Sequence, residues 1–297
     1  MITLLVDASL QSGLGHLRRA QKLQKHLIRI GLESRLIAPH PLADINMDWL
    51  RDFRVSKSDR LIVDSYQASP DFYHHVISTA RTLLIFEDFP HFDLPPKTFR
   101  INPAFRAENL YKNPSEHHFL GSDFMPFESA FKVSGKQLIP TIQTLFISFG
   151  GSAQSLGFYQ QALERLQNMP YKLHICAPSE IAHALPYCPQ AIYHESLDLP
   201  QIATLLKQSD VALLGGGGML YESILALTPI LAIEVAPNQR PQLEALSAIK
   251  ACKRSTFQTL QDDLEALNLK ARLAMQTAQK KLNIGNALES TLKAIFA

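Results

Sequence analysis

The chain alternates between short apolar runs and longer stretches with helical periodicity. In the first half, short and largely apolar runs fall at Ile2–Val6, Leu61–Val63 and Leu83–Phe86, and Ser34–Ile37 is a further predicted strand. Runs of this length predict strands buried on both faces of a parallel sheet. Between the first two runs, apolar residues of His16–Ile30 recur at spacings of three and four and predict a helix with one buried face.

The same alternation restarts after residue 140. Predicted strands lie near Thr144–Ser148, Leu173–Cys176, Ala191–Tyr193, Val211–Leu214 and Pro229–Ile233. Two βαβ series predict an α/β protein of two doubly wound, Rossmann-like domains that face a cleft. The polar break at Ser134–Gln137 is the best linker candidate, so we expect domains at 1–136 and 137–285. A C-terminal helix over 286–297 could cross back.

Length and composition fit this architecture and exclude other classes. The 297 residues exceed one typical domain, and 46% hydrophobic with 19% charged residues is a globular balance. A net charge of +2, without a Lys/Arg-rich run, argues against nucleic acid as a partner. The apolar run Ile2–Val6 is too short for a signal peptide or a membrane span. We therefore expect a cytoplasmic protein that does not insert stably into membranes.

Neither the cysteines nor the histidines predict a metal site. Cys176, Cys188 and Cys252 are an odd number at wide spacings, which is typical of reduced core thiols. The adjacent pairs His74-His75 and His117-His118 point apart on any regular element and make poor metal ligands. No Asp-x-Asp follows a strand, so a metal-diphosphate site is not expected either. We predict no metal and no cofactor.

The most informative segment is a strand followed by four glycines and a helix. Gly215, Gly216, Gly217 and Gly218 remove every Cβ from the turn, so backbone N–H groups can approach a ligand closely. The helix that starts near Met219 directs its positive end at the same point, which suits phosphate. Glu222 lies about one turn into that helix, within reach of a sugar hydroxyl. With the Asn238-Gln239 loop, this unit predicts a nucleotide-sugar site. Backbone N–H groups of a second turn, Gly150-Gly151-Ser152, are expected to assist.

A second glycine turn follows the first strand. Gly13 and Gly15 permit a tight turn that leaves His16 at the start of a helix. Because a positive helix end disfavours imidazolium, we expect His16 to be neutral near pH 7 and able to accept a proton. Arg19, one turn later, could bind phosphate or orient a carboxylate. His16 as a helix cap or a phosphate ligand without proton transfer is the alternative.

Further polar residues follow neighbouring strands. Asp64 and Tyr66 come after Leu61–Val63 and share the sheet edge with His16, where ligands of open α/β sheets bind. For Tyr66, packing is as good an explanation as ligand contact. Asp88 also reaches that edge, although a turn or helix-capping role explains it better.

These residues resemble a known family. Gly13-x-Gly15-His16-x-x-Arg19 after Asp7 resembles the N-terminal motif of the UDP-sugar hydrolases of the pseudaminic acid pathway. The resemblance covers most of the chain. It includes Ile62–Tyr66, Asp88, Asn102-Pro103, Phe149–Ser152, Glu222 and Asn238-Gln239. It implies the two-domain GT-B fold shared with the UDP-N-acetylglucosamine transferase that makes lipid II.

The resemblance also implies a reaction and residue roles. The family hydrolyses UDP-2,4-diacetamido-2,4,6-trideoxy-β-L-altropyranose to UDP and free sugar, in a pathway that serves flagellin glycosylation and surface polysaccharides. The motif histidine, here His16, is the family's proposed base, and the tyrosine matching Tyr66 lines the sugar pocket. Asp64 then tunes the imidazole or positions the sugar, and Asn102 is a weaker candidate for an N-acyl contact.

Three positions depart from the family pattern. Leu5 stands where the family has arginine, Ala153 where it has aspartate, and Glu128 where it has a second arginine. These departures weaken the assignment of the sugar more than that of the fold. Hydrolysis of a UDP-sugar, without metal and with His16 as base, is the expected function. An inverting glycosyltransferase with a UDP-sugar donor is the alternative, and a non-enzymatic UDP-sugar sensor is a third possibility.

Overall fold

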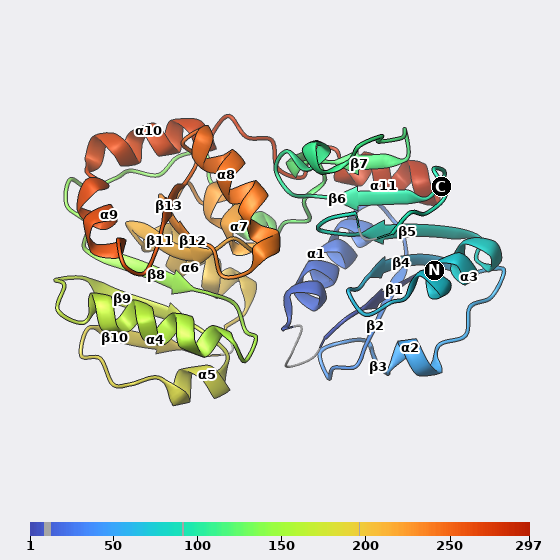
Figure 1. The fold of residues 1–297 in the computed structure, drawn as a ribbon, viewed down its shortest axis with the longest axis horizontal. Coiled ribbons are helices and arrows are strands. Elements are labelled where there is room, and N and C mark those ends of the chain that lie inside the picture. Colours follow the sequence, from blue (N-terminus) through green and yellow to red (C-terminus); the bar gives the residue numbers. More distant parts are fainter. Residues whose placement is uncertain (9–12, 91, 196) are drawn as a thin grey trace. The chain divides into compact units, whose positions relative to one another are not determined.

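A computed structural model describes residues 1–8, 13–90, 92–195 and 197–297 (Figure 1). Its contacts divide the chain into unit 1, residues 1–127 with 283–297, and unit 2, residues 128–282. Each unit is an α/β fold around one parallel sheet, as the sequence predicted. The structure divides the two units between residues 127 and 128, nine residues before the division expected between 136 and 137. The C-terminal residues, 283–297, cluster with unit 1.

In its described residues, unit 1 holds a seven-stranded sheet in the order β3-β2-β1-β4-β5-β6-β7. Its strands are β1 (Ile2–Val6), β2 (Ser34–Ala38), β3 (Ile45–Asn46), β4 (Arg60–Asp64), β5 (Thr82–Phe86), β6 (Phe99–Asn102) and β7 (His118–Leu120). Its helices are α1 (Gly15–Arg29), α2 (Trp49–Asp52), α3 (Pro70–Thr79) and α11 (Leu288–Phe296). The strand order reverses between β1 and β4, which makes their carboxyl ends the switch point of the sheet.

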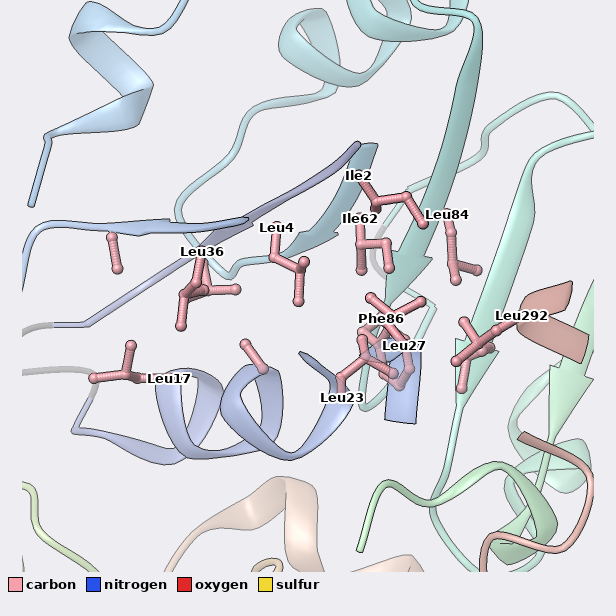
Figure 2. Packing of buried hydrophobic residues seen from close by; sticks show 14 of the residues in the cluster. Ile2, Leu4, Leu17, Leu23, Leu27, Leu36, Ile62, Leu84, Phe86 and Leu292 are labelled. Atoms are coloured by element: carbon pink, nitrogen blue, oxygen red, sulfur yellow. The ribbon is translucent and has the colours of Figure 1, made fainter. Parts of the chain in front are cut away.

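Helices cover both faces of this sheet because alternate residues of each strand point to opposite sides. On one face, Leu17, Leu23 and Leu27 of α1 pack on the strands with Leu292 of α11 (Figure 2). On the other face, Trp49 and Tyr73 pack against a separate set of strand residues. Burial on both sides explains why four of the five residues of β1 are apolar.

In its described residues, unit 2 holds a six-stranded sheet in the order β10-β9-β8-β11-β12-β13. Its strands are β8 (Thr144–Ser148), β9 (Lys172–Cys176), β10 (Ala191–His194), β11 (Val211–Gly215), β12 (Ile230–Ile233) and β13 (Lys253–Ser255). Its helices are α4 (Ser155–Leu166), α5 (Ser179–Ala184), α6 (Leu199–Gln208), α7 (Met219–Leu225), α8 (Arg240–Ala248), α9 (Leu260–Ala266) and α10 (Leu269–Gln279). Here the order reverses between β8 and β11, so the two glycine turns follow the strands of the switch point.

The polar break expected to be a linker belongs to unit 2. Lys136 is half-buried, and its ammonium donates to the carbonyls of Leu206 and Ser209 and to the hydroxyl of Thr228, at 3.1, 2.5 and 2.8 Å. These bonds fix residue 136 at the end of α6. Polarity in the sequence did not distinguish a solvated linker from a lysine that caps a helix.

Candidate functional site

The switch point of unit 1 brings four predicted residues into one network. His16 and Arg19 lie on the first turns of α1, and Asp64 ends β4. His16 Nδ1 lies 2.5 Å from Asp64 Oδ1, and Arg19 donates to both oxygens of the same carboxylate at 2.7 Å. The fourth member, Tyr66, meets the His16 ring edge to face, with the ring centroids 4.6 Å apart.

The Asp64 carboxylate decides which nitrogen of His16 is reactive. An ionised carboxylate only accepts hydrogen bonds, so a neutral His16 carries its proton on Nδ1 and keeps Nε2 as the basic nitrogen. Burial raises the pKa of Asp64, but Arg19 and then His16 outweigh it, and the net pKa lies well below its usual range. Asp64 is therefore an anion at neutral pH.

The pKa of His16 shifts in the opposite direction to the one expected. Burial lowers the pKa of His16, but the charge and hydrogen bond of Asp64 outweigh it, and the net pKa is raised above 6.5. The positive helix end does not decide the charge of His16, because the Asp64 carboxylate, 48 residues away in sequence, stabilises the imidazolium directly.

Asp88 joins the network from the segment just after β5. Arg19 Nη1 donates to Asp88 Oδ1 at 2.6 Å, and the hydroxyl of Tyr66 donates to Asp88 Oδ2. The expected turn or capping role of Asp88 is thus replaced by a contact that joins α1, β4 and β5. Arg19 thus bonds to two carboxylates, those of Asp64 and Asp88, in agreement with its predicted role of orienting a carboxylate. Its other predicted role, phosphate binding, stays a prediction.

Asp7, at the end of β1, holds the backbone of the tyrosine loop. Its carboxylate accepts from Ser65 Oγ at 2.8 Å and from the backbone N–H of Tyr66 at 2.7 Å. Tyr66 is consequently fixed at both ends, by Asp7 at the backbone and by Asp88 at the hydroxyl. Gly13, two residues before α1, has φ 71°, a left-handed conformation that favours glycine. Ser12, before it, lies outside the described residues.

Asn102, the last residue of β6, is buried. Its side chain is fully buried, and Oδ1 accepts from the backbone N–H of Ala104 at 3.1 Å in the turn after β6. Its predicted contact with an N-acyl group stays a prediction. A neighbouring set of buried polar residues, which the sequence analysis missed, joins Glu87 to Tyr111 at 2.7 Å and to Arg100 at 3.4 Å.

In unit 2 the four glycines have unequal roles. A Cβ on Gly215 would lie 2.9 Å from Val235 Cγ2, and one on Gly216 would lie 2.7 Å from Gln239 Cβ. These two glycines are required for packing against the segment after β12. Gly217 has open space around it and, like Gly218, is exposed. Of the four glycines, Gly217 and Gly218 are therefore the exposed pair, and the predicted ligand role of the turn stays a prediction.

Gln239 holds the glycine loop by its side chain. Its Oε1 accepts from the backbone N–H groups of Gly216 and Val235 at 2.9 and 3.1 Å. Gln242 donates to the Gly216 carbonyl and accepts from Tyr221 at 2.8 Å. Gln239 thus fixes the glycine loop, and its predicted ligand role stays a prediction. The exposed Asn238 beside it keeps its predicted ligand role as a prediction.

The second glycine turn follows β8 and is held by a tyrosine that the sequence analysis missed. Gly150 has φ 89°. The buried hydroxyl of Tyr159 accepts from the N–H of Phe149 at 3.0 Å and lies 3.1 and 2.8 Å from the carbonyls of Gly150 and Cys176. Ser152 Oγ lies 3.1 Å from Ser155 Oγ at the start of α4.

Glu222 lies on the first turns of α7 and is 4% exposed. Contact with a ligand therefore requires one carboxylate oxygen to reach the edge of the loop.

Among the described residues, no group of three or more His, Cys, Asp and Glu side chains is placed to hold a metal ion. No helix in the described part of the chain is long and apolar enough to span a membrane.

Comparison with known proteins gives one curated relative. No family model matches the chain. Over 98% of its length, the chain is 28% identical to a Helicobacter pylori protein named "Pseudaminic acid cytidylyltransferase and UDP-2,4-diacetamido-2,4,6-trideoxy-beta-L-altropyranose hydrolase". The match covers 55% of that protein, so the chain spans about half the length of the curated relative.

Solved structures share the fold at low sequence identity. MurG of Acinetobacter baumannii has a TM-score of 0.57 at 13% identity, over 99% of both chains. The calicheamicin glycosyltransferase CalG4 has a TM-score of 0.59 at 12%, over 99% of this chain and 98% of its own. A glycosyltransferase from Rickettsia africae has 0.59 at 11%, over 99% and 97%. These likenesses confirm the predicted GT-B fold and do not extend to the reaction.

Proposed function

Because the chain is a divergent relative of a protein that carries a UDP-sugar hydrolase activity and has the GT-B fold, we propose that it hydrolyses a UDP-linked diacetamido-trideoxy sugar to UDP and free sugar. The observation that carries the proposal is the His16–Asp64 pair at the switch point of unit 1. It supplies a basic nitrogen, Nε2, of fixed orientation on the first turn of α1.

In the proposed reaction, His16 Nε2 takes a proton from water while the water oxygen forms a bond to the anomeric carbon. The bond from that carbon to the diphosphate oxygen breaks, and UDP leaves with the bonding electrons. Asp64 keeps the imidazole in the tautomer with Nδ1–H and stabilises the imidazolium that forms, which is the established part of a carboxylate behind a catalytic histidine. Tyr66, against the same ring, positions the sugar.

We propose that the glycine turns of unit 2 bind the leaving UDP. Backbone N–H groups of Gly217, Gly218 and Met219 are the donors for the diphosphate, with Gly150–Ser152 assisting, and such groups stabilise developing negative charge without reorganisation. Glu222 accepts hydrogen bonds from the ribose. The held geometry of the loop, through Gln239 and Gln242, supports this assignment because fixed donors cost less to order on binding.

The direct test is release of UDP from the purified protein, with no acceptor added, from a panel of UDP-diacetamido-trideoxy sugars. We expect turnover by the native protein. His16→Asn should keep UDP affinity and lose about 10²–10⁴ in kcat, because a general base contributes that factor. His74→Asn, at an exposed histidine of α3, is the matched control and should be unaffected. Near-normal kcat in His16→Asn would remove His16 from the reaction.

A glycosyltransferase remains the second candidate. The similar solved structures, which share only the fold, are glycosyltransferases or MurG. UDP release that depends on an added saccharide or lipid acceptor would favour this alternative over hydrolysis. Binding of UDP-sugars with no turnover under either condition would favour a sensor.

A further inference from the structure

Two exposed aromatic rings lie next to the proposed base. Tyr66 is 42% exposed and Phe89, which follows β5 closely, is 37% exposed. Their rings are stacked with centroids 5.9 Å apart and an interplanar angle of 26°, and Tyr66 also meets the His16 ring at 4.6 Å. His16, Tyr66 and Phe89 therefore form a continuous row of rings that begins at the base.

The Tyr66 side chain of this row is held at both ends, although it is exposed. The backbone N–H of Tyr66 donates to Asp7, and its hydroxyl donates to Asp88. The polar end of Tyr66 is thus occupied within the protein, and what the Tyr66–Phe89 pair offers outward is carbon surface. Rigid aromatic surface of this kind binds apolar groups with little loss of conformational entropy.

The chemistry beside the row limits what can bind there. The same sheet edge carries Asp64, Arg19 and Asp88, so the ligand must place a polar reacting centre at His16 and an apolar group one ring further along. A common sugar is hydroxylated all round and offers little to carbon surface. A 6-deoxy, N-acetylated sugar carries a methyl at C6 and one on each acetamido group, a few bonds from the anomeric carbon.

We infer that Phe89, stacked on Tyr66, is a specificity-determining residue that selects the methyl groups of a deoxy, acetamido sugar. This inference rests on the proposed function and deepens it. The group that Phe89 recognises is a methyl group of the sugar, either at C6 or on an acetamido substituent. Phe89 positions and discriminates the substrate and takes no part in proton transfer.

The test compares Phe89→Ala, Phe89→Leu and a control on three substrates. The substrates are the UDP-diacetamido-trideoxy sugar, its 6-hydroxy analogue and its analogue with a free 4-amino group. The control is Leu50→Ala on α2, because Leu50 is 38% exposed and so matches Phe89 in exposed fraction. Thermal unfolding of each variant confirms that it folds.

We expect Phe89→Ala to lower kcat/KM for the parent sugar by about 10–200-fold, mostly through KM, since one apolar group in a pocket discriminates by that factor. Phe89→Leu should recover part of the loss. The loss should shrink for whichever analogue lacks the recognised methyl, which identifies its source. An equal loss on all three substrates, or none on any, overturns the inference.

A second measurement separates this inference from the proposed function. Binding of the free diacetamido-trideoxy sugar, followed by ligand-observed NMR, needs no turnover. Weaker binding by Phe89→Ala than by the native protein supports the aromatic platform even if no UDP is released, in which case only the proposed hydrolysis fails. Equal binding by both proteins overturns the platform.

Discussion

The two switch points of this chain have the same topology and opposite chemistry. In unit 1 the carboxyl ends of β1 and β4 meet in a network of ionisable side chains, His16, Arg19, Asp64 and Asp88. In unit 2 the ends of β8 and β11 meet in glycine turns held by the amide of Gln239 and the hydroxyl of Tyr159. The first arrangement can move a proton, and the second can only present oriented dipoles.

The difference predicts that the two units, built on the same sheet architecture, have different functions. Ionisable groups change charge with pH and with one another, which suits catalysis. Backbone N–H groups keep their polarity at all pH values, which suits the binding of an anion. If this division holds, changes at the switch point of unit 1 should alter the rate, and changes at that of unit 2 should alter UDP binding.

Asp64→Asn should have the largest effect, on both rate and pH dependence. An amide can donate to His16 Nδ1 and so favour the wrong tautomer, and comparable changes cost about 10⁴ in kcat. In the native enzyme kcat should fall as pH falls through the raised pKa of His16, because the imidazolium cannot accept a proton. In the variant the remaining activity should persist to lower pH. An acid limb at the same pH in both proteins would contradict the Asp64–His16 coupling.

Gly216→Ala should weaken UDP binding and destabilise unit 2 by about 1–3 kcal/mol, the usual cost of overpacking. The new Cβ would meet Gln239 Cβ at 2.7 Å and displace the segment that holds the loop. Gly217→Ala is the matched control, because open space surrounds that position. Urea unfolding and calorimetric titration with UDP measure both quantities. Equal destabilisation at the two glycines would contradict the packing role of Gly216.

Glu222→Gln should weaken UDP binding by about 1–3 kcal/mol, because it removes charge-assisted hydrogen bonds from the ribose. The glutamine keeps the size of the side chain, and Glu222→Ala should cause a similar or larger loss. Glu164→Gln, at an exposed position of α4, serves as the control in the same calorimetric titration. Unchanged affinity in Glu222→Gln would remove Glu222 from the UDP site.

The smallest effect is expected at His26, which also lies on α1 and whose pKa moves in the opposite direction to that of His16. Its ring bonds to Phe127 and to Glu289, and burial lowers its pKa. The unfolded chain therefore binds this proton first, so His26 should lower the stability of the fold as pH falls below about 6.5. His16, whose pKa is raised, stabilises the fold below pH 6.5 and loses that contribution as pH rises through its folded pKa.

The measurement is the free energy of unfolding at pH 5.5 and 7.5 for the native protein and for His26→Gln. The variant should lose less stability than the native protein between pH 7.5 and 5.5. His75→Gln, at an exposed histidine of α3, should behave like the native protein. A native pH dependence in His26→Gln would show that His26 does not contribute to it.

The sequence alone determined the fold class, because local sequence patterns are enough to predict it. Apolar runs, one helix face and glycine turns each depend on neighbours within a few residues, and the curated relative and the GT-B structures confirm the resemblance drawn from the glycine–histidine motif. The topology then placed His16, Asp64, Tyr66 and Asp88 at one edge, as expected of residues that follow parallel strands.

The tertiary structure decided the properties that depend on distant partners. The charge preference of His16 is set by Asp64, 48 residues away, and the glycines at 215 and 216 are required by side chains after β12. The burial of Asn102 and the capping role of Lys136 likewise arise from contacts across the fold. Residue type and spacing predict which groups reach a sheet edge, but burial and paired charges determine their chemistry, and these exist only once the chain has packed.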